Sequence, residues 1–405
     1  MGTLSAIYSP MQFEKIVPIR DKRDFPLNPK SDTLYFIDGI VDFGSKPINV
    51  PTGGIYIAGH GNEISGITSS IDNYSLFTGA TGGNIFFRSM FISITGSNSK
   101  VFDVTSATGN EAIEFYEVNF NSCSSLGEIT NYRQMLEFNT GRFGGTPELT
   151  LSGNINGYRI TTSIVRGLNA GFTGSLFKAG TALSFSNRFL TDMNCDLPAG
   201  ANVSDFSPSN FQAPSLVQIS GGVFSRDGVI STGDNQLFTN LDPDDLVCVW
   251  KNNEGLRNTF EGGRITISSE TATVISTVDT FYDIAGVWTA DGLQHFSSPV
   301  NGRLQNDGTN PTEYKLFASL VLNGTANDSL KVRVVRWDDE NQVFVVLRDQ
   351  IATVNSLSGP RDVAIVAFSW RVEVNQNDYI KLQVSNASGT GDITAETGSY
   401  FELSQ

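Results

Sequence analysis

The chain has 405 residues, of which only 17% are charged, and its 27 basic and 42 acidic side chains give a formal net charge of -15. This balance argues against nucleic acid and anionic membrane surfaces as partners, because phosphate binding needs clustered Lys and Arg. No run of 18 apolar residues predicts a membrane span, and the first fifteen residues lack the basic and apolar regions of a signal peptide. We therefore expect no membrane insertion and no secretion signal.

The residue composition predicts an all-β protein. The 40 glycines and 28 phenylalanines, with abundant Ser, Thr and Asn, favour strands and turns over helices. Cys123, Cys195 and Cys248 stand alone, without the spacing of a metal or redox site. We expect these three cysteines to be buried free thiols in a protein that folds in a reducing cytoplasm.

Residues 1–33 show no regular apolar pattern. They contain Pro10, Pro18, Pro26 and Pro29, and a mixed-charge run from Arg20 to Asp24. Because proline disrupts both helices and central strands, this segment is predicted to be an attachment arm that a neighbouring protein orders. A frayed terminus is an equally good interpretation.

Residues 34–245 carry a repeat that predicts a right-handed parallel β-helix. An apolar pair, a loop of small residues and an aromatic-rich strand recur, with units starting near Phe77, Phe102, Phe138 and Phe177. One such unit cannot bury its own apolar face, so stacked coils form the core together. The starts lie 25, 36 and 39 residues apart, which predicts loops of different length on one side of the rod.

The last part of the chain predicts a different all-β domain. After a neck at residues 246–280, longer alternating strands follow at intervals of about ten residues, which is typical of a jelly-roll β-sandwich over residues 281–405. Val332 and Val334 alternate with Arg333, Val335 and Trp337. We expect one face of this strand to lie in the core and the other to be covered in an oligomer.

This combination resembles bacteriophage tail-spike and tail-fibre proteins, which have a β-helix shaft and a trimerising head. The residues that carry the resemblance to a tumour-necrosis-factor-like or complement-globular-like head are 281–288, 330–334, 374–382 and 399–403. The resemblance implies a homotrimer, attachment to other virion proteins, and recognition of a glycan or protein on the host surface. It also implies that the protein is made in the bacterial cytoplasm and assembled into the virion.

Cleavage of a polysaccharide is the only enzymatic reaction that the sequence suggests. Glycoside cleavage needs two carboxylates that flank the bond. The candidates are Glu111, Glu114 and Glu117 in one coil, and Asp227, Glu254 and Glu261 near the end of the β-helix. No motif fixes a pair, and solvated surface acids are the plainer interpretation. His60 and His295 are the only histidines, and we expect both to be structural.

No cofactor or metal site is predicted. The acidic turns at Asp242–Asp245 and Asp338–Glu340 offer oxygen ligands, but neither has the spacing of a calcium loop. Each of the four tryptophans could stack on a sugar ring, but we expect at least two of them to pack in a core. They are Trp250, Trp288, Trp337 and Trp370.

The sequence therefore predicts a trimeric virion spike, tail fibre or head fibre with an N-terminal arm, a β-helical shaft and a receptor-binding head. The alternative is a polysaccharide depolymerase, either a hydrolase or a lyase, on the same scaffold. A structural part of the virion without a receptor is a third possibility. The sequence leaves open whether the arm joins the tail or the head, and whether one chain or three interlaced chains form each coil.

Overall fold

The computed structural model describes residues 13–230, 237–243, 245–259, 261–308, 312–354 and 363–404. The chain divides into two compact units, Met1–Pro243 with Val247–Thr259, and Asp244–Leu246 with Phe260–Gln405. In the described residues, strands form both units and the helical structure is one short 3-10 turn, Pro208–Asn210. No helix in these residues is long and apolar enough to cross a membrane. The all-β prediction is confirmed.

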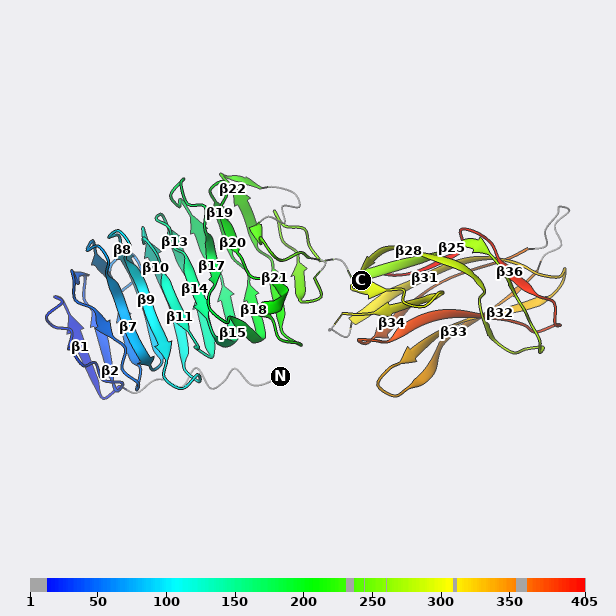
Figure 1. Cartoon of the computed structure of the whole chain (residues 1–405), viewed down its shortest axis with the longest axis horizontal. Coiled ribbons are helices and arrows are strands. Elements are labelled where there is room, and N and C mark those ends of the chain that lie inside the picture. Colours follow the sequence, from blue (N-terminus) through cyan, green and yellow to red (C-terminus); the bar gives the residue numbers. More distant parts are fainter. Residues whose placement is uncertain are drawn as a thin grey trace. The chain divides into compact units, whose positions relative to one another are not determined.

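The first unit is a parallel β-helix with three sheets, whose strands stack coil upon coil (Figure 1). The first sheet contains β1 (Lys15–Ile19), β2 (Thr33–Ile37), β5 (Ile55–Gly59), the first half of β8 (Ile85–Ile94), the first half of β10 (Ala112–Asn121), β12 (Gln134–Phe138), β15 (Asn154–Thr161), β18 (Ser184–Thr191), β21 (Leu216–Ser220) and β24 (Cys248–Lys251). The second contains β3 (Ile40–Asp42), β6 (Gly66–Ser69), the second halves of β8 and β10, β13 (Gly141–Phe143), β16 (Ile164–Arg166), β19 (Asn194–Leu197) and β22 (Val223–Arg226). The third contains β4 (Ile48–Asn49), β7 (Ser75–Gly82), β9 (Lys100–Ser106), β11 (Gly127–Thr130), β14 (Leu149–Ser152), β17 (Ser175–Ala179) and β20 (Asn202–Ser204).

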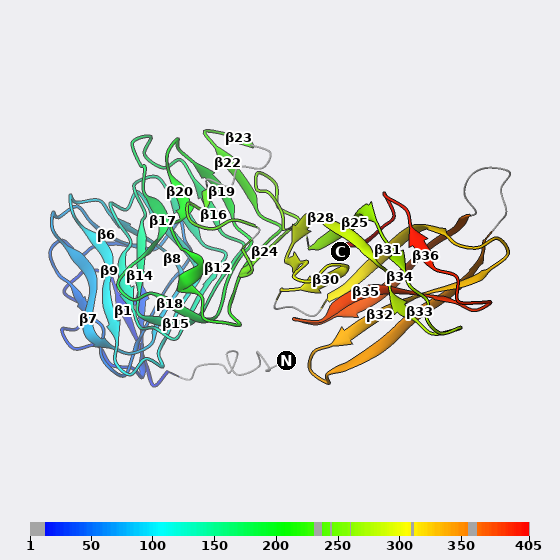
Figure 2. The same ribbon diagram turned by 45° about the vertical axis from the view of Figure 1, so that its right-hand side comes forward.

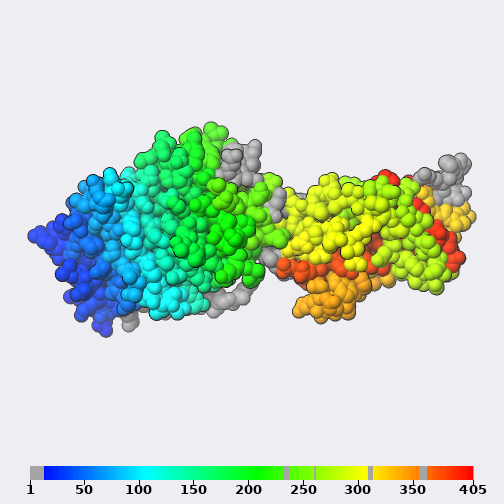
Figure 3. Space-filling model, viewed as in Figure 1, coloured from blue at the N-terminus to red at the C-terminus, as the bar shows by residue number. Residues whose placement is uncertain are grey.

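These pairings are all parallel; the exception in this unit is β23 (Val229–Ile230), which pairs antiparallel with β22. The coils follow one another within a single chain, so the stacking does not need three interlaced chains. In the space-filling view the successive coils form bands from blue to green (Figure 3).

Single left-handed residues turn the chain from the first sheet to the second. Ser89 has φ 51° in the middle of β8, and Glu117 has φ 57° in the middle of β10. Asn139 and Thr162 occupy the same corner in the next two coils, with φ 51° and 56°. A left-handed residue redirects the strand within one residue, so these four coils bend without a long loop at this corner.

Apolar side chains stack inside the β-helix. Ile85, Ile113, Met135 and Tyr158 occupy one register column of the first sheet and are at most 3% exposed. Aromatic side chains stack in the same way, with 5.6 Å between the ring centroids of Phe77 and Phe102. Each buried phenylalanine contributes about 2–3 kcal/mol from the removal of apolar surface from water. The core is therefore continuous through the stack of coils, as the repeat predicts.

The register corrects the predicted repeat. Phe77 and Phe102 are true equivalents, since they pair directly between β7 and β9. The next residues in this column of the third sheet are Gly127 and Leu149, and only then Phe177. Phe138 lies on β12 in the first sheet, where its side chain faces outward. The coils are therefore shorter and more even than predicted, because Phe138 is an outward residue of the first sheet and not the start of a unit.

The predicted domain boundaries also need correction. Residues 15–19 form β1 and pair with β2, so most of the segment assigned to an arm is the first coil of the β-helix. Pro18 is tolerated because β1 is the edge strand of the stack. Pro10 lies outside the described residues. At the other end, the predicted neck does not form a separate part, since β24 belongs to the first unit and β25 (Gly262–Glu270) to the second.

The second unit is an antiparallel β-sandwich of two sheets with jelly-roll features (Figure 2). One sheet, which we call the inner sheet, contains β25, β26 (Ala272–Thr273), β28 (Gly286–Gln294), β31 (Thr312–Asn323), β34 (Val363–Val374), β36 (Ile393–Ala395) and β37 (Tyr400–Ser404). The outer sheet contains β27 (Tyr282–Asp283), β29 (Phe296–Ser297), β30 (Arg303–Asn306), β32 (Ser329–Asp338), β33 (Val343–Thr353) and β35 (Tyr379–Asn386). Their facing side chains, among them Ile265, Leu320, Val332, Leu382 and Phe401, are at most 2% exposed and form a separate core.

The three cysteines lie in the interior of the β-helix. Cys123, Cys195 and Cys248 are free thiols and all are buried, as predicted. Burial raises the pKa of the Cys123 thiol to about 12, so this cysteine is not a nucleophile at neutral pH.

Candidate functional site

A groove of about 490 Å³ runs across the outer surface of the first sheet of the β-helix. It lies over β10, β12, β15 and β18, which are neighbours in the sheet. The side chains that line it alternate with core residues, as a strand requires. The ones used below are Glu114, Leu136, Phe138, Arg159, Arg188 and Leu190.

The hollow comes from a missing side chain. Gly157 on β15 stands between Gln134 and Arg188 in the register of the sheet. A Cβ atom added there would contact only the Arg188 carbonyl oxygen, at 3.6 Å. The space above Gly157 is therefore open to a ligand.

Aromatic rings continue from one side of this groove along the sheet. Phe138 stacks on Tyr116 with 4.7 Å between ring centroids and an interplanar angle of 16°. The Arg88 guanidinium lies 5.1 Å from the centroid of the Tyr116 ring. Tyr56 and Phe86 form a second stacked pair at 4.8 Å. Half-buried rings of this kind offer flat apolar faces with polar groups beside them, which suits sugar rings.

The groove contains one carboxylate among its described lining residues. Burial raises the pKa of Glu114, which favours the protonated acid. Arg159 donates from Nε to Thr161 Oγ1 at 3.1 Å, and Arg188 is exposed. A second carboxylate, which glycoside hydrolysis requires, is not among the described residues that line the groove.

The other two acids of this coil serve the structure. Burial by itself raises the pKa of Glu111, but hydrogen bonds from Ser106 and Thr108 outweigh it and lower the pKa to about 2. Glu117 accepts a hydrogen bond from Ser89 Oγ at 2.7 Å, at the corner between the first two sheets. Glu117 has a left-handed φ of 57°, which breaks the regular alternation that would place Glu111 and Glu117 on one face of a strand.

Asp227 and Glu254 are exposed residues of the first unit, whereas Glu261 is a buried residue of the second. Asp227 is an exposed turn residue with φ 49°, and Glu254 is exposed where its backbone pairs with Gly222 and Phe224. Glu261 belongs to the second unit and is only 3% exposed. Its carboxylate accepts a hydrogen bond from the Tyr314 hydroxyl at 2.9 Å and lies 3.8 Å from His295 Nδ1. Its burial makes it unsuitable for acting on a polymer.

Both histidines have structural surroundings. His60 Nε2 lies 3.2 Å from Asp38 Oδ1, and its ring meets the edge of Phe36. His295 is buried in the sandwich, with Nε2 3.2 Å from the Asp245 carbonyl oxygen. Neither imidazole ring has a hydroxyl or thiol partner in the hydrogen bonds of the described residues.

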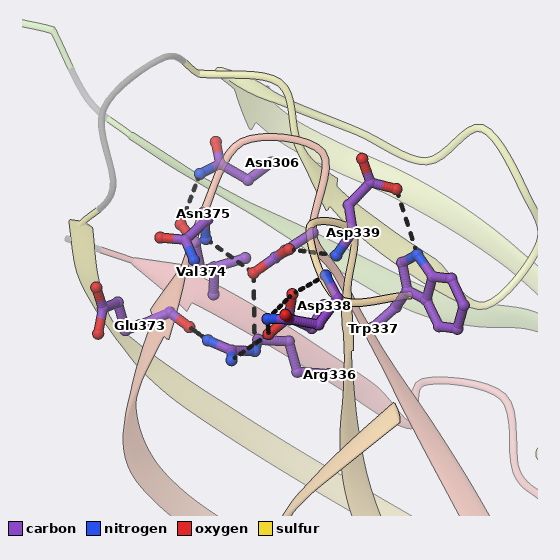
Figure 4. A network of polar contacts seen from close by, with 10 residues as sticks. Asn306, Arg336, Trp337, Asp338, Asp339, Glu373, Val374 and Asn375 are labelled. Carbon is purple, nitrogen blue, oxygen red and sulfur yellow. Dashed lines mark hydrogen bonds and ion pairs between the residues drawn. The ribbon is translucent and has the colours of Figure 1, made fainter. Parts of the chain in front are cut away.

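The acidic turn after β32 is part of a closed polar network (Figure 4). Asp378 is 1% exposed and accepts hydrogen bonds from the backbone N–H groups of Asp339 and Asn375 at 2.9 and 3.0 Å. Hydrogen bonds from the backbone and side chain of Asn341, with the charge of Arg336, lower the pKa of Asp338. These carboxylates already have donors, so they fix the turn between β32 and β33.

The structure describes the other acidic turn, Asp242–Asp245, only in part. Asp242 pairs with Arg257, while Asp244 lies outside the described residues. No cluster of three or more His, Cys, Asp or Glu side chains that could hold a metal ion occurs in the part of the chain that the structure describes.

Two of the four tryptophans pack in cores, as predicted. Trp250 is fully buried in the β-helix and Trp288 is 8% exposed in the sandwich. Trp337 is half-buried and Trp370 is 45% exposed, so these two remain available to a ligand.

The sequence singled out Glu114 and Phe138 but not the other residues of the groove. The alternation in Gln134–Phe138 indicates a strand with one outward face, but Leu136, Arg159 and Leu190 meet only through the register of β12, β15 and β18. That register depends on the lengths of the loops between coils, for which the sequence contains no motif.

Comparisons with known proteins give a limited result. No protein family profile and no curated protein matches this chain. Among solved structures, mouse APRIL at pH 5.0 is similar with 10% identity and a TM-score of 0.25, covering 36% of this chain and 98% of that one. The Eiger TNF of S. frugiperda is similar with 14% identity and a TM-score of 0.25, covering 36% of this chain and 92% of that one. Both are TNF-like jelly-roll proteins, and at these TM-scores the fold assignment depends on the strand order above.

Proposed function

We propose that this chain is the subunit of a homotrimeric attachment protein, a tail spike or fibre of a bacteriophage virion, that binds a glycan on the host surface. The observation that carries the proposal is the groove on the β-helix, with its stacked rings and guanidinium groups. An open groove on a rigid scaffold suits an extended polymer, because the scaffold loses no conformational entropy when the polymer binds. The sandwich then serves as trimerisation and receptor-binding head, and the N-terminal segment joins other virion proteins.

Trimer formation is supported by two strands at the edges of the sandwich. Within the described residues, β33 pairs with β32 alone and β34 pairs with β31 alone. The hairpin of β32 and β33 projects from the body of the sandwich (Figures 1 and 3). Val346, Ile351 and Ile365 on these edges are 49%, 63% and 68% exposed. A long apolar edge strand invites pairing and burial, which a closed oligomer provides.

Depolymerase activity is the second candidate, since Glu114 is a half-buried acid with a raised pKa inside the groove. The lining supplies it with no second carboxylate, so we propose binding as the function of the groove.

Two measurements on the purified full-length chain test the proposal. Light scattering should give a mass about three times the 43.9 kDa of the chain, and an array of bacterial surface polysaccharides should show retention of the protein on particular glycans. A stable monomer that binds no glycan would contradict the proposal. Release of reducing ends from a retained polysaccharide would replace it with the depolymerase.

A further inference from the structure

The outward face of the outer sheet of the sandwich carries an unusual set of side chains. β35 lies between β30 and β32, and in register Lys381 stands between Arg303 and Val335, while Gln383 stands between Asp283 and Arg333. Tyr379 stands beside Trp337, which in turn stands beside Phe344 of β33. The alternate residues Ile380, Leu382 and Val384 point into the core and are at most 2% exposed. We call this surface the cationic aromatic face; its members are Phe281, Asp283, Arg303, Arg333, Trp337, Phe344, Tyr379, Lys381 and Gln383.

Three cations of this face lie over aromatic rings. The Arg303 guanidinium is 4.4 Å from the centroid of Tyr379, and the Arg333 guanidinium is 4.1 Å from that of Phe281. Lys381 Nζ is 4.4 Å from the centroid of Phe344. Because each ring restricts the motion of its cation, the positive charges are held in place before any ligand arrives.

The charges are only partly neutralised. Lys381 pairs with Asp283 at 2.7 Å, and Gln383 Nε2 donates to the same carboxylate at 2.6 Å. Arg333 Nε donates to Gln383 Oε1 at 2.7 Å, which is a neutral acceptor. Asp349 stands opposite Arg333 on β33, yet the described residues include no ion pair from Arg333 or from Arg303.

Two guanidinium groups that form no ion pair within the described residues are notable in a chain with a net charge of -15. They stand two strands and two residues apart, so their Cα atoms are separated by about 12 Å from the ordinary spacing of a sheet. Guanidinium binds carboxylate through parallel N–H···O bonds, and the neighbouring faces of Trp337 and Tyr379 can stack on a sugar ring. Charge complementarity thus indicates an acidic ligand with flat apolar faces.

We propose that the cationic aromatic face binds carboxylate-bearing oligosaccharides, such as those of uronic or sialic acids, with Arg303 and Arg333 holding the carboxylates. This inference rests on the proposed attachment function and gives the sandwich a ligand class separate from the groove of the β-helix. A second copy would cover the exposed aliphatic residues of the edge strands β33 and β34. Arg303 and Arg333 lie on β30 and β32 instead, so the two guanidinium groups are left for the glycan.

The test uses the full chain and three purified acidic oligosaccharides: tetragalacturonate, a hyaluronan hexasaccharide and a linear sialic acid trimer. Each is compared with its own carboxyl methyl ester by titration calorimetry. We expect at least one acid to bind at least tenfold more tightly than its ester. The double variant Arg303→Gln with Arg333→Gln should lower that affinity at least tenfold, since each lost charged hydrogen bond is worth about that much.

The matched control is Arg264→Gln, because Arg264 lies 3.8 Å over Tyr400 in the other sheet of the same unit and should leave the affinity unchanged. Equal binding of acids and esters, or equal binding by the double variant, would overturn the inference. Polyphosphate that binds as tightly as the acids would also overturn it, because recognition would then depend on charge alone. A lower oligomer mass of the double variant would overturn it too, because the face would then be an interface between copies. If Gly157→Leu in the groove of the β-helix abolishes glycan binding and the double arginine variant does not, this inference is wrong and the proposed function stands.

Discussion

Glu137 Oε1 lies 2.8 Å from Arg142 Nη2 inside the β-helix, and each side chain is only 1% exposed. Arg142 also donates to the Leu176 carbonyl oxygen at 3.2 Å and lies 4.4 Å over the Phe177 ring. Glu137 accepts hydrogen bonds from Thr140, at 2.8 Å, and from Tyr158. A charged pair thus crosses an otherwise apolar core and ties β12 and β13 to the third sheet.

Removal of one partner of this pair should be costly. Arg142→Met leaves the Glu137 carboxylate buried without its cation, and we expect a loss of about 3–5 kcal/mol in the free energy of unfolding of the β-helix. The double variant with Glu137→Gln should recover most of that loss. Calorimetry of the two variants checks this, and equal unfolding temperatures for both would show that the pair contributes no coupling.

The pKa of Glu111 predicts a pH dependence. It is lowered to about 2 in the folded chain from an ordinary value of 4.5, so its contribution to stability is present above about pH 4.5 and is lost as the pH falls towards 2. Glu111→Gln should therefore lower the unfolding temperature at pH 7 by a few degrees, and the difference from the parent should shrink below pH 4.5. The control is Glu63→Gln, at an exposed glutamate. A constant difference across this range would contradict the prediction.

Gly127 is required by a close backbone approach. It has φ +84°, and a Cβ atom there would lie 2.0 Å from the Phe102 carbonyl oxygen of the neighbouring coil. Gly127→Ala should lower stability by well over the roughly 1–2 kcal/mol expected for a left-handed alanine. Gly109 also has a positive φ, +77°, but with open space around it, so Gly109→Ala measures the backbone effect alone. Similar unfolding temperatures for both variants would refute the steric argument.

The groove of the β-helix can be filled. Gly157→Leu places a branched side chain in the open space above β15, and we expect at least a tenfold loss of affinity for any polysaccharide that the groove binds, with unchanged unfolding temperature. Gly171→Leu adds the same side chain at an exposed glycine with no atom within 4 Å and should bind normally. Binding by both variants at the parent's affinity would place the glycan elsewhere.

The apolar edge of the sandwich can be made polar. Val346→Glu with Ile351→Glu puts two charges on β33, and we expect the mass in solution to fall from three chains to one, because burying unpaired carboxylates is costly. Val229→Glu, at a 66% exposed valine of the β-helix, is the matched control and should leave the mass unchanged. A trimer that survives both substitutions would place its interface on other residues.

The sequence alone determined the all-β class, the stacked coils, the change to longer alternating strands, and the buried thiols. These depend on local patterns: the period of two in a strand, small residues at turns, and apolar columns such as Phe77 with Phe102. Local patterns do not contain the offset between coils, which is why they wrongly predict a coil start at Phe138 and an arm at residues 15–19.

Only the tertiary structure decided which polar side chains meet. Glu137 and Arg142 face inward and neutralise each other, Glu114 shares a groove with Arg159 and Arg188, and Arg303 and Arg333 come to one sheet face from β30 and β32. A shift of one residue in any of these strands would send each side chain to the opposite face. Register is set by the packing of all the coils and strands together, and that is the information a linear pattern of residues lacks.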